Sequence, residues 1–229
     1  MGHIPGTGKV AIAGEQMLAD HAGCLYWPQE KLLVVSDLHL EKGSSLARRG
    51  LMIPPYDTAK TLELLALCIA RWQPEVVVSL GDSFHDERAD DRLPDVYREM
   101  LAACMGGRHW IWISGNHDPH PPEGLGGTAA DVLAVGAITF RHEPLRNAGA
   151  GEISGHLHPQ ARIVRRGKSV RRRCFASDGS RLIMPAFGAF TGGLNIRDRA
   201  FDGFFDEASF HAHVMGRERI YMIGGGQLV

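Results

Sequence analysis

The stretch Leu32-Leu33-Val34-Val35-Ser36-Asp37-Leu38-His39 joins a run of large aliphatic residues to an aspartate and a histidine. Such a run predicts a buried strand with polar residues at its exposed carboxyl end. Side chains alternate across a strand, so Asp37 and His39 are expected on the same side. A carboxylate and an imidazole placed together can hold one divalent metal ion, although many strands end in this way by chance.

The first half of the chain alternates strand and helix patterns. Apolar residues recur every three or four positions over Thr58–Trp72, with Asp57 as the expected N-cap, and a second helix is predicted over Pro94–Met105. Two further aliphatic runs, Val76–Leu80 and His109–Ile113, follow these helices. Strand, helix, strand, helix, strand predicts a parallel sheet covered by helices, in which ligands gather at the carboxyl ends of the strands.

The second half of the chain is rich in short strand patterns. A hairpin turn is predicted at residues 177–180, a last helix over residues 206–214 and a final strand over residues 219–223. Residues 1–8 are expected to be a flexible N-terminus. No linker divides the chain, so a single domain over residues 1–229 is predicted. Other short strands are expected at 10–13, 16–20, 24–27, 137–141, 152–154, 162–164, 172–176 and 181–184.

The composition is that of an ordinary globular protein. Of 229 residues, 44% are hydrophobic and 22% are charged, and the formal net charge is −1. This balance argues against a disordered chain and gives no overall attraction to nucleic acid or membranes. Four widely spaced cysteines indicate free thiols, and neither an export signal nor an apolar run long enough to cross a membrane is visible. A cytoplasmic protein is therefore expected.

Five segments place metal-binding side chains directly after a predicted strand. Together they offer enough carboxylate, amide and imidazole groups for two metal ions that share a bridging carboxylate. The glycines before three of them suit turns in which the backbone passes close to a bound group. The segments carry Asp37 and His39, then Asp82, then Asn116 and His117, then His142, and last His156 and His158.

In chain order the motifs are Asp-x-His, Gly-Asp, Gly-Asn-His-Asp, His and Gly-His-x-His, within residues 37–158. This series resembles the calcineurin-like metallophosphoesterase superfamily. Two longer stretches, Ser36–Ser44 and Pro185–Leu194, are most similar to the bacterial ligase-associated DNA damage response endonucleases. The resemblance implies an α/β calcineurin-like fold, with a βαβ-type first half and a strand-rich second half that form a two-sheet sandwich flanked by helices.

The resemblance also implies a ligand set. His142 stands in the thinnest motif, and His120 competes with it, although His120 follows His117 by only three residues in a proline-rich loop. Two ions are expected, with manganese favoured and iron or zinc as alternatives, because the ligands mix carboxylate, amide and imidazole. The first ion would be held by Asp37, His39 and His158, the second by Asn116, His142 and His156, and both by the bridging Asp82.

The implied reaction is hydrolysis of a phosphoester. Two cations about 3.5–4 Å apart neutralise phosphoryl oxygens and lower the pKa of a bridging water, so that a metal-bridging hydroxide attacks the phosphorus. The resemblance places His117, paired with Asp118, beside the scissile phosphate, where it assists the leaving group by about 10²–10⁴-fold. His85 follows Asp82 closely, and it contacts substrate, orients a ligand or is an ordinary loop residue.

A basic segment begins four residues after His158. On a nearly neutral chain, a hairpin over residues 162–184 is expected to lie along a nucleic-acid backbone. The alternative is a solvated hairpin whose charges prevent edge-to-edge aggregation. No aromatic residues interleave with the charges, which argues against base stacking. The cations are Arg162, Arg165, Arg166 and Lys168, followed by the expected substrate contacts Arg171, Arg172 and Arg173.

The main hypothesis is a two-metal phosphodiesterase that acts on nucleic acid, namely a DNA endonuclease linked to DNA repair. DNA is the expected partner, and a DNA ligase or helicase-associated repair protein is implied by the resemblance alone. One alternative is a small-molecule phosphodiesterase or phosphomonoesterase that acts on nucleotides. The other is a scaffold without activity, which would be expected to lack some ligands, whereas this chain retains them all.

Overall fold

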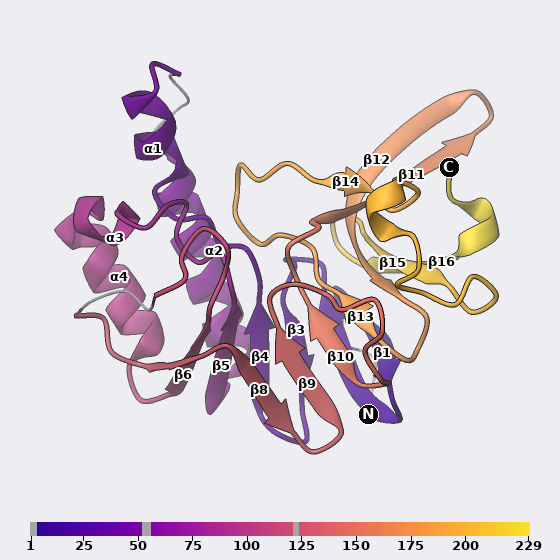
Figure 1. The fold of residues 1–229 in the computed structure, drawn as a ribbon, viewed down its shortest axis with the longest axis horizontal. Coiled ribbons are helices and arrows are strands. Elements are labelled where there is room, and N and C mark those ends of the chain that lie inside the picture. Colours follow the sequence, from indigo (N-terminus) through magenta and orange to yellow (C-terminus); the bar gives the residue numbers. More distant parts are fainter. Residues whose placement is uncertain (1–3, 52–55, 121–123) are drawn as a thin grey trace.

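Two β-sheets packed face to face form the centre of the computed structural model, which describes residues 4–51, 56–120 and 124–229 (Figure 1). The side chains between the sheets form one apolar core. Val34 and Val78 from the first sheet are buried there beside Phe140, Ile153 and Phe175 from the second. The predicted two-sheet sandwich is therefore confirmed.

The first sheet has seven strands in sequence order. Strands β1 to β4 are antiparallel neighbours, and β4 to β7 are parallel neighbours. The first strand starts at Thr7, within the stretch predicted to be a flexible N-terminus, of which residues 1–3 lie outside the described part. The strands are β1 (Thr7–Ile12), β2 (Glu15–Asp20), β3 (Leu25–Trp27), β4 (Leu32–Val35), β5 (Val76–Leu80), β6 (His109–Ile113) and β7 (Thr128–Ala130).

Four helices flank the first sheet, at the left in Figure 1. They are α1 (Lys42–Arg48), α2 (Asp57–Trp72), α3 (Ala89–Arg92) and α4 (Asp95–Met105). Apolar residues of α2 and α4, including Leu65 and Leu101, pack on Val35 and Trp110 of the sheet. The two long helices were predicted. The short helix α1 was not, because Gly43-Ser44-Ser45 has weak helix propensity.

The predicted N-cap of α2 is wrong. Tyr56 occupies that position, and Asp57 is the first helical residue. The Asp57 carboxylate accepts a hydrogen bond from the backbone N–H of Gly43 at 2.8 Å. Asp57 therefore binds a free amide in the first turn of α1, not one of α2. The sequence identified a capping residue but assigned it to the wrong helix.

The second sheet has nine strands, including the basic hairpin formed by β11 and β12. This hairpin projects from the sandwich on the side opposite the helices (Figure 1). The predicted turn at residues 177–180 is confirmed, because β12 pairs with β13 directly after it. The strands are β8 (Val132–Val135), β9 (Ile138–Arg141), β10 (Glu152–Ser154), β11 (Pro159–Arg165), β12 (Lys168–Ser177), β13 (Leu182–Ile183), β14 (Leu194–Asn195), β15 (His211–Met215) and β16 (Ile220–Gly224), and the 3₁₀ turns are Arg199–Phe201 and Gly225–Gln227.

The helix predicted over residues 206–214 is wrong. His211–Met215 forms β15, which pairs with β12 and β16. Phe210, Ala212 and Val214 are buried together in a satellite core. Apolar residues four positions apart fit a helix face, but they fit one face of a strand equally well. Pairing with β12 decides in favour of the strand.

Candidate metal centre

The predicted ligand segments meet at one edge of the sandwich. They directly follow β4, β5 and β6 of the first sheet and β9 and β10 of the second. Strands β4 to β6 are parallel to one another, as are β9 and β10, so their carboxyl ends fall at common edges. Two groups of side chains with metal-binding atoms are found there, namely Asp37, His39 and His158, and Asp82, His142 and His156.

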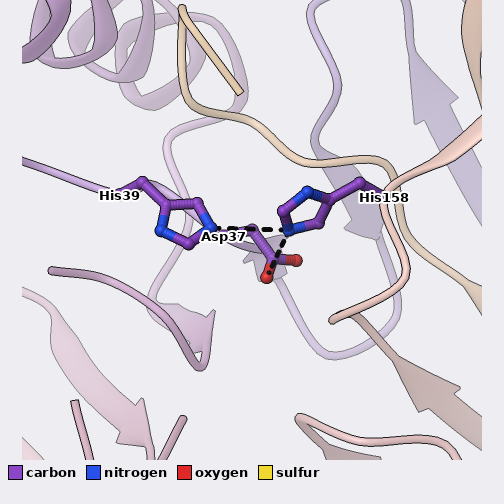
Figure 2. A group of neighbouring side chains, drawn as sticks. All are labelled: Asp37, His39 and His158. Atoms are coloured by element: carbon purple, nitrogen blue, oxygen red, sulfur yellow. Dashed lines mark hydrogen bonds and ion pairs between the residues drawn. The ribbon is translucent and has the colours of Figure 1, made fainter. Parts of the chain in front are cut away.

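The first group joins residues 119 positions apart in sequence. The imidazoles of His39 and His158 point toward each other above the carboxylate of Asp37 (Figure 2). Their Nε2 atoms are 3.4 Å apart, and Nε2 of His158 is 3.0 Å from Oδ1 of Asp37. That Oδ1 atom is buried and, apart from its ion pairs with His158 and His142, has no hydrogen-bond partner. A buried carboxylate oxygen that only imidazole rings approach fits a position that faces a cation.

The second group is tighter and includes an amide oxygen. Oδ1 of Asn116 lies 3.0 Å from Nε2 of His142 and 2.9 Å from Nδ1 of His156, and these two nitrogens are 3.2 Å apart. Oδ1 of Asp82 is 3.4 Å from Nε2 of His142. Atoms that bind one ion at about 2.1 Å and at right angles to each other are separated by about 3 Å. The four donor atoms therefore have the spacing of ligands around one cation.

Asp82 lies between the two groups. Its Oδ1 belongs to the second group, and its Oδ2 is 3.8 Å from Nε2 of His39 in the first. The Asp82 Oδ1 atom also accepts a hydrogen bond from the backbone N–H of His117 at 2.9 Å. One oxygen of the carboxylate thus faces each group, which fits the bridging role that the resemblance implies.

The backbone beneath these ligands is left-handed. The φ angles are 54° at Asp37, 44° at His39, 48° at Asp82, 68° at His156 and 46° at His158. This conformation costs about 1–2 kcal/mol for each residue with a side chain. Strand alternation was the expected reason that Asp37 and His39 share a side. That reason is wrong, because β4 ends at Val35, before both residues. Alternate residues in left-handed conformation place the two side chains together instead.

Glycines make room for the crossing of these segments. A Cβ atom on Gly155 would lie 2.0 Å from Oγ of Ser36, and one on Gly115 would lie 2.2 Å from the backbone nitrogen of Asp82. Either substitution would push two ligand segments apart. The sequence predicted a close approach at these glycines, and the structure shows one ligand segment passing close to another there.

Hydrogen bonds and charge fix the state of the ligands. Nδ1 of His142 donates to the carbonyl of Leu80 at 3.0 Å, which leaves Nε2 facing the site. Burial alone would lower the pKa of His142, but its hydrogen bond to Asp82 and the charges of Asp37 and Asp82 raise it to about 9. A cation bound at Nε2 would displace the proton that this raised pKa favours.

His117 stands at the open side of the site. Its Nδ1 donates to the carbonyl of His85 at 3.0 Å, and its Nε2 is 4.0 Å from Oδ2 of Asp82. Its side chain is 42% exposed, so a substrate can reach it. The ring stacks on that of His85 with centroids 5.3 Å apart. The structure therefore places His117 beside both groups, with one ring nitrogen held and the other available.

Asp118 is not paired with the His117 ring in the manner expected. Its Oδ2 accepts hydrogen bonds from the backbone N–H groups of Ser83, at 2.7 Å, and Phe84, at 3.1 Å. Burial and the nearby charge of Asp82 raise the pKa of Asp118 to about 7, although these hydrogen bonds act in the opposite direction. Asp118 ties the loop after β6 to the loop after β5 and so positions His117 and Asp82.

His85 contacts the ring of a metal-binding residue. Its Nδ1 lies 3.3 Å from Nδ1 of His39, on the side of that ring away from Asp37 and His158. Of the three roles left open by the sequence, the geometry favours the one in which His85 orients His39. His85 also lines an open cleft of about 390 Å³ together with Asn116 and His117.

Arg49 and Arg88 also line this cleft. Neither belongs to a motif, and each is brought to the cleft by the packing of α1 and α3, which the sequence did not predict. The carboxylates of Asp86 and Glu87 share the same rim. No pattern in the sequence would have selected these two arginines among the other surface cations.

The three arginines at the base of the basic hairpin have distinct environments. Arg173 is half-buried and donates through Nη1 to the carbonyls of Ala186 and Phe187, at 2.8 and 3.3 Å. Arg171 donates to the carbonyl of Gly193 at 2.6 Å, and Arg172 is exposed. Arg173 and Arg171 thus hold the segment 185–194, so they have a structural role that the sequence did not suggest.

The segment 185–194 in turn rests on the metal-binding loop. The backbone N–H of Phe187 donates to the carbonyl of Ser36, and that of Gly188 donates to the carbonyl of Asp37 at 3.1 Å. A Cβ on Gly188 would lie 2.4 Å from the carbonyl oxygen of Leu38. Two stretches far apart in the sequence, 36–44 and 185–194, are therefore in direct contact.

Comparison with known proteins agrees with this geometry. The profile of the calcineurin-like phosphoesterases matches residues 30–173, more than half of the chain. The chain belongs to the calcineurin-like phosphoesterase family. A similar solved structure is the crystal structure of the Pseudomonas putida nuclease MPE, with a TM-score of 0.73 and 25% identity over 95% of this chain and 100% of that one. No curated protein matches the sequence.

This calcineurin-like chain is a metal-dependent phosphoesterase. Its family uses two divalent metals, and the chain provides two groups of metal-binding side chains. Across the described residues, no helix combines the length and the apolar character needed to span a bilayer.

Proposed function

We propose that this phosphoesterase is a two-metal nuclease that hydrolyses the phosphodiester linkages of DNA. The observation that carries the proposal is the pair of metal-binding groups that share Asp82 beside an open cleft. The similarity to a nuclease and the cations near the site favour a polynucleotide over a small ester. A polyanionic strand needs a site that is open at both ends and flanked by positive charge.

The proposed ligands are those that the resemblance implies. Asp37, His39 and His158 would hold one ion, Asn116, His142 and His156 would hold the other, and Asp82 would contribute to both. Two bound divalent cations, Mn²⁺ or alternatively iron or Zn²⁺, would neutralise the phosphoryl oxygens and lower the pKa of a bound water.

His117 is proposed to assist the leaving oxygen. Because its Nδ1–H is engaged by the carbonyl of His85, Nε2 is the nitrogen that faces the site, and the imidazolium form of the ring would pass its second proton from Nε2 to the leaving oxygen. The departing oxygen of a sugar is a poor leaving group and gains most from such a proton. Asp118 is a positioning residue, because its carboxylate binds the backbone N–H groups of Ser83 and Phe84. His85 holds the ring of His39 in its orientation.

Membership of the ligase-associated endonucleases, and with it a role in DNA repair, is proposed from the stretches 36–44 and 185–194. The contact between these stretches supports their treatment as one unit, since Gly188 binds the backbone of Asp37 and Ala189 donates to Oγ1 of Thr61. A DNA ligase or helicase-associated partner and a cytoplasmic location remain predictions from the sequence.

Incubation of the protein with Mn²⁺ and either circular single-stranded DNA, duplex plasmid DNA or bis(4-nitrophenyl) phosphate tests the proposal. We expect metal-dependent scission of a circular substrate, which requires internal cleavage, and its loss in Asp82→Asn. Asp91→Asn on the exposed surface of α3 is the matched control, because it makes the same chemical change away from the site.

Two outcomes would contradict the proposal. Hydrolysis of the small ester without scission of either DNA would indicate a small-molecule phosphodiesterase. A protein that binds no metal and hydrolyses neither substrate would indicate a scaffold.

A further inference from the structure

A second pocket of about 390 Å³ lies beside the base of the basic hairpin. It is lined by side chains of both sheets and is separate from the cleft that contains His85 and His117. Its polar wall consists of His21, Gln160, Arg171, Arg172, Arg173 and Arg217.

This pocket opens at the same edge of the sandwich as the metal centre. Strand β2 ends directly before His21 and runs in the same direction as β4, because β3 is antiparallel to both. Two strands of separation correspond to about 10 Å. On the second sheet, Gln160 follows His158 by two residues and pairs with Arg173, and β15 ends beside them at Met215.

The segment 185–194 links the pocket to the metal centre. Arg173 holds its carbonyls at Ala186 and Phe187, and the next residue, Gly188, binds the backbone of Asp37. A polymer that occupies both sites would therefore pass along this segment.

The pocket has positive charge without a matching carboxylate. Among the described residues that line it, none is acidic, and no ion pair in the described part of the chain involves Arg171, Arg172, Arg173 or Arg217. Burial lowers the pKa of Arg173, which shows that its positive charge is poorly solvated. A half-buried guanidinium bonded only to carbonyls is stabilised by an anion, and the planar fork of arginine suits phosphate oxygens.

We propose that this pocket binds a backbone phosphate of the DNA strand at a position outside the scissile linkage. The inference rests on the proposed nuclease function and adds a second contact point to it. Arg172 on β12 and Arg217 after β15 reach the phosphate from two segments of the second sheet, and Arg173 forms the floor. The tip of the hairpin takes no part.

A binding experiment with matched variants tests the pocket. One variant carries Arg172→Glu and Arg217→Glu, and the control carries Arg165→Glu and Lys168→Glu at the hairpin tip. All four residues are exposed, and both variants change the net charge equally. Fluorescence anisotropy with a single-stranded oligonucleotide of about 16 nucleotides, in EDTA, avoids turnover. Cooperative thermal unfolding shows that each variant is folded, and Arg172→Gln with Arg217→Gln replaces the first pair if it is not.

We expect the pocket variant to bind about 10–100-fold more weakly than the wild type and the tip variant to lose less than about threefold. The slope of log K against log salt should become shallower by about 0.7 for each lost phosphate contact in the pocket variant only. Equal losses of affinity in both variants would show that the hairpin attracts DNA only diffusely, and the pocket proposal would be wrong. Unchanged affinity in the pocket variant would also contradict the proposal.

Titration with inorganic phosphate tests whether the ligand of the pocket is free phosphate or a phosphate of the DNA backbone. If phosphate binds the wild type but not the pocket variant, while both bind the oligonucleotide equally, the ligand is a free phosphate and the proposal falls. The nuclease function fails independently. If the wild type binds DNA through the pocket but makes no cuts with Mn²⁺, the pocket proposal stands and the nuclease proposal falls. If DNA is cut and all variants bind it with equal affinity, only the nuclease proposal stands.

Discussion

The metal centre and the arginine-lined pocket at the base of the basic hairpin, here called the cationic pocket, share one edge of the sandwich but are constructed in different ways. The metal centre uses short side chains on left-handed backbone, and its donor atoms in the second group lie 2.9–3.4 Å apart. The pocket uses long guanidinium side chains, three of them exposed, from β12 and from the turn after β15, both in the second sheet. A metal ion demands fixed geometry, whereas a phosphate charge is recognised over a wider range of positions. The metal centre is therefore assembled from segments that each carry a recognisable motif, whereas the pocket depends on arginines that only tertiary packing brings together.

The strongest test of the metal centre, the site with fixed geometry, is Asp82→Asn. Loss of the shared carboxylate should reduce the rate of phosphodiester hydrolysis by at least about 10³-fold and lower the metal content below two ions per chain. Kinetics with bis(4-nitrophenyl) phosphate and elemental analysis measure both, with Asp91→Asn as the control. Two retained ions and a near-native rate would show that Asp82 does not bridge.

His117→Ala separates proton donation from metal binding. We expect the rate of DNA cleavage to fall by about 10²–10⁴-fold, because the sugar oxygen needs a proton to depart. With a nitrophenolate leaving group, which departs without one, the loss should be about tenfold or less. His120→Ala, three residues away and exposed, is the control and should retain both activities. Equal losses on the two substrates would contradict a role at the leaving group.

A pH titration probes the strand that leads to the cationic pocket. His213 of β15 is 3% exposed, and its Nε2 atom has no hydrogen-bond partner. Burial, with a smaller effect from His211, lowers the pKa of His213 to about 4 from an ordinary value of 6.5. The unfolded chain therefore takes up the proton first as the pH falls from 6.5 to 4, and the folded state loses about 3 kcal/mol of stability.

His213→Leu should remove this loss. Urea unfolding at pH 7 and pH 4 measures the free energy of unfolding in both proteins, and titrations common to both cancel in the difference. If the two proteins lose equal stability, His213 is protonated in the fold or reaches solvent. Either result would contradict a buried, neutral His213 in the folded protein.

The smallest expected effect concerns the tie between α1 and α2. Asp57→Ala removes the acceptor of the Gly43 amide and should lower the free energy of unfolding by about 1–3 kcal/mol. Asp95→Ala is the matched control, because Asp95 also lies in a first helical turn but is exposed. Its loss should be about 0.3–1 kcal/mol. Urea unfolding compares the two, and similar losses would mean that the tie adds nothing beyond the helix dipole.

The sequence was sufficient for the strands that carry the ligands and for the ligand set as a hypothesis, because each ligand follows an aliphatic run and a glycine or turn signal. It did not predict the left-handed backbone at Asp37 and His39, since no local pattern distinguishes a continuing strand from one that ends at Val35. The structural role of Arg173 was also missed, since its carbonyl partners lie 13 and 14 positions away.

The cationic pocket was only partly within reach of the sequence. Its arginines from β12 were recognised as a basic patch, but His21 and Arg217 were not, because they come from segments about 150 residues before and 45 residues after that strand. The strand β15 was predicted as a helix, which hid the position of Arg217. Where apolar residues four positions apart fit both a helix and a strand, pairing with a neighbouring strand determines which of the two forms.

The start of α2 supports two separate segments, residues 41–43 and the segment 185–194. Asp57 holds Gly43, Thr58 accepts the backbone N–H of Glu41, and Thr61 accepts that of Ala189. The N-terminal end of α1 is thereby tied to the start of α2, and Arg49, directly after α1, lies at the rim of the cleft. Substitutions at Arg49 would alter the rim of the cleft without disturbing the ligands. Substrate preference can thus diversify among related chains while the catalytic chemistry stays constant.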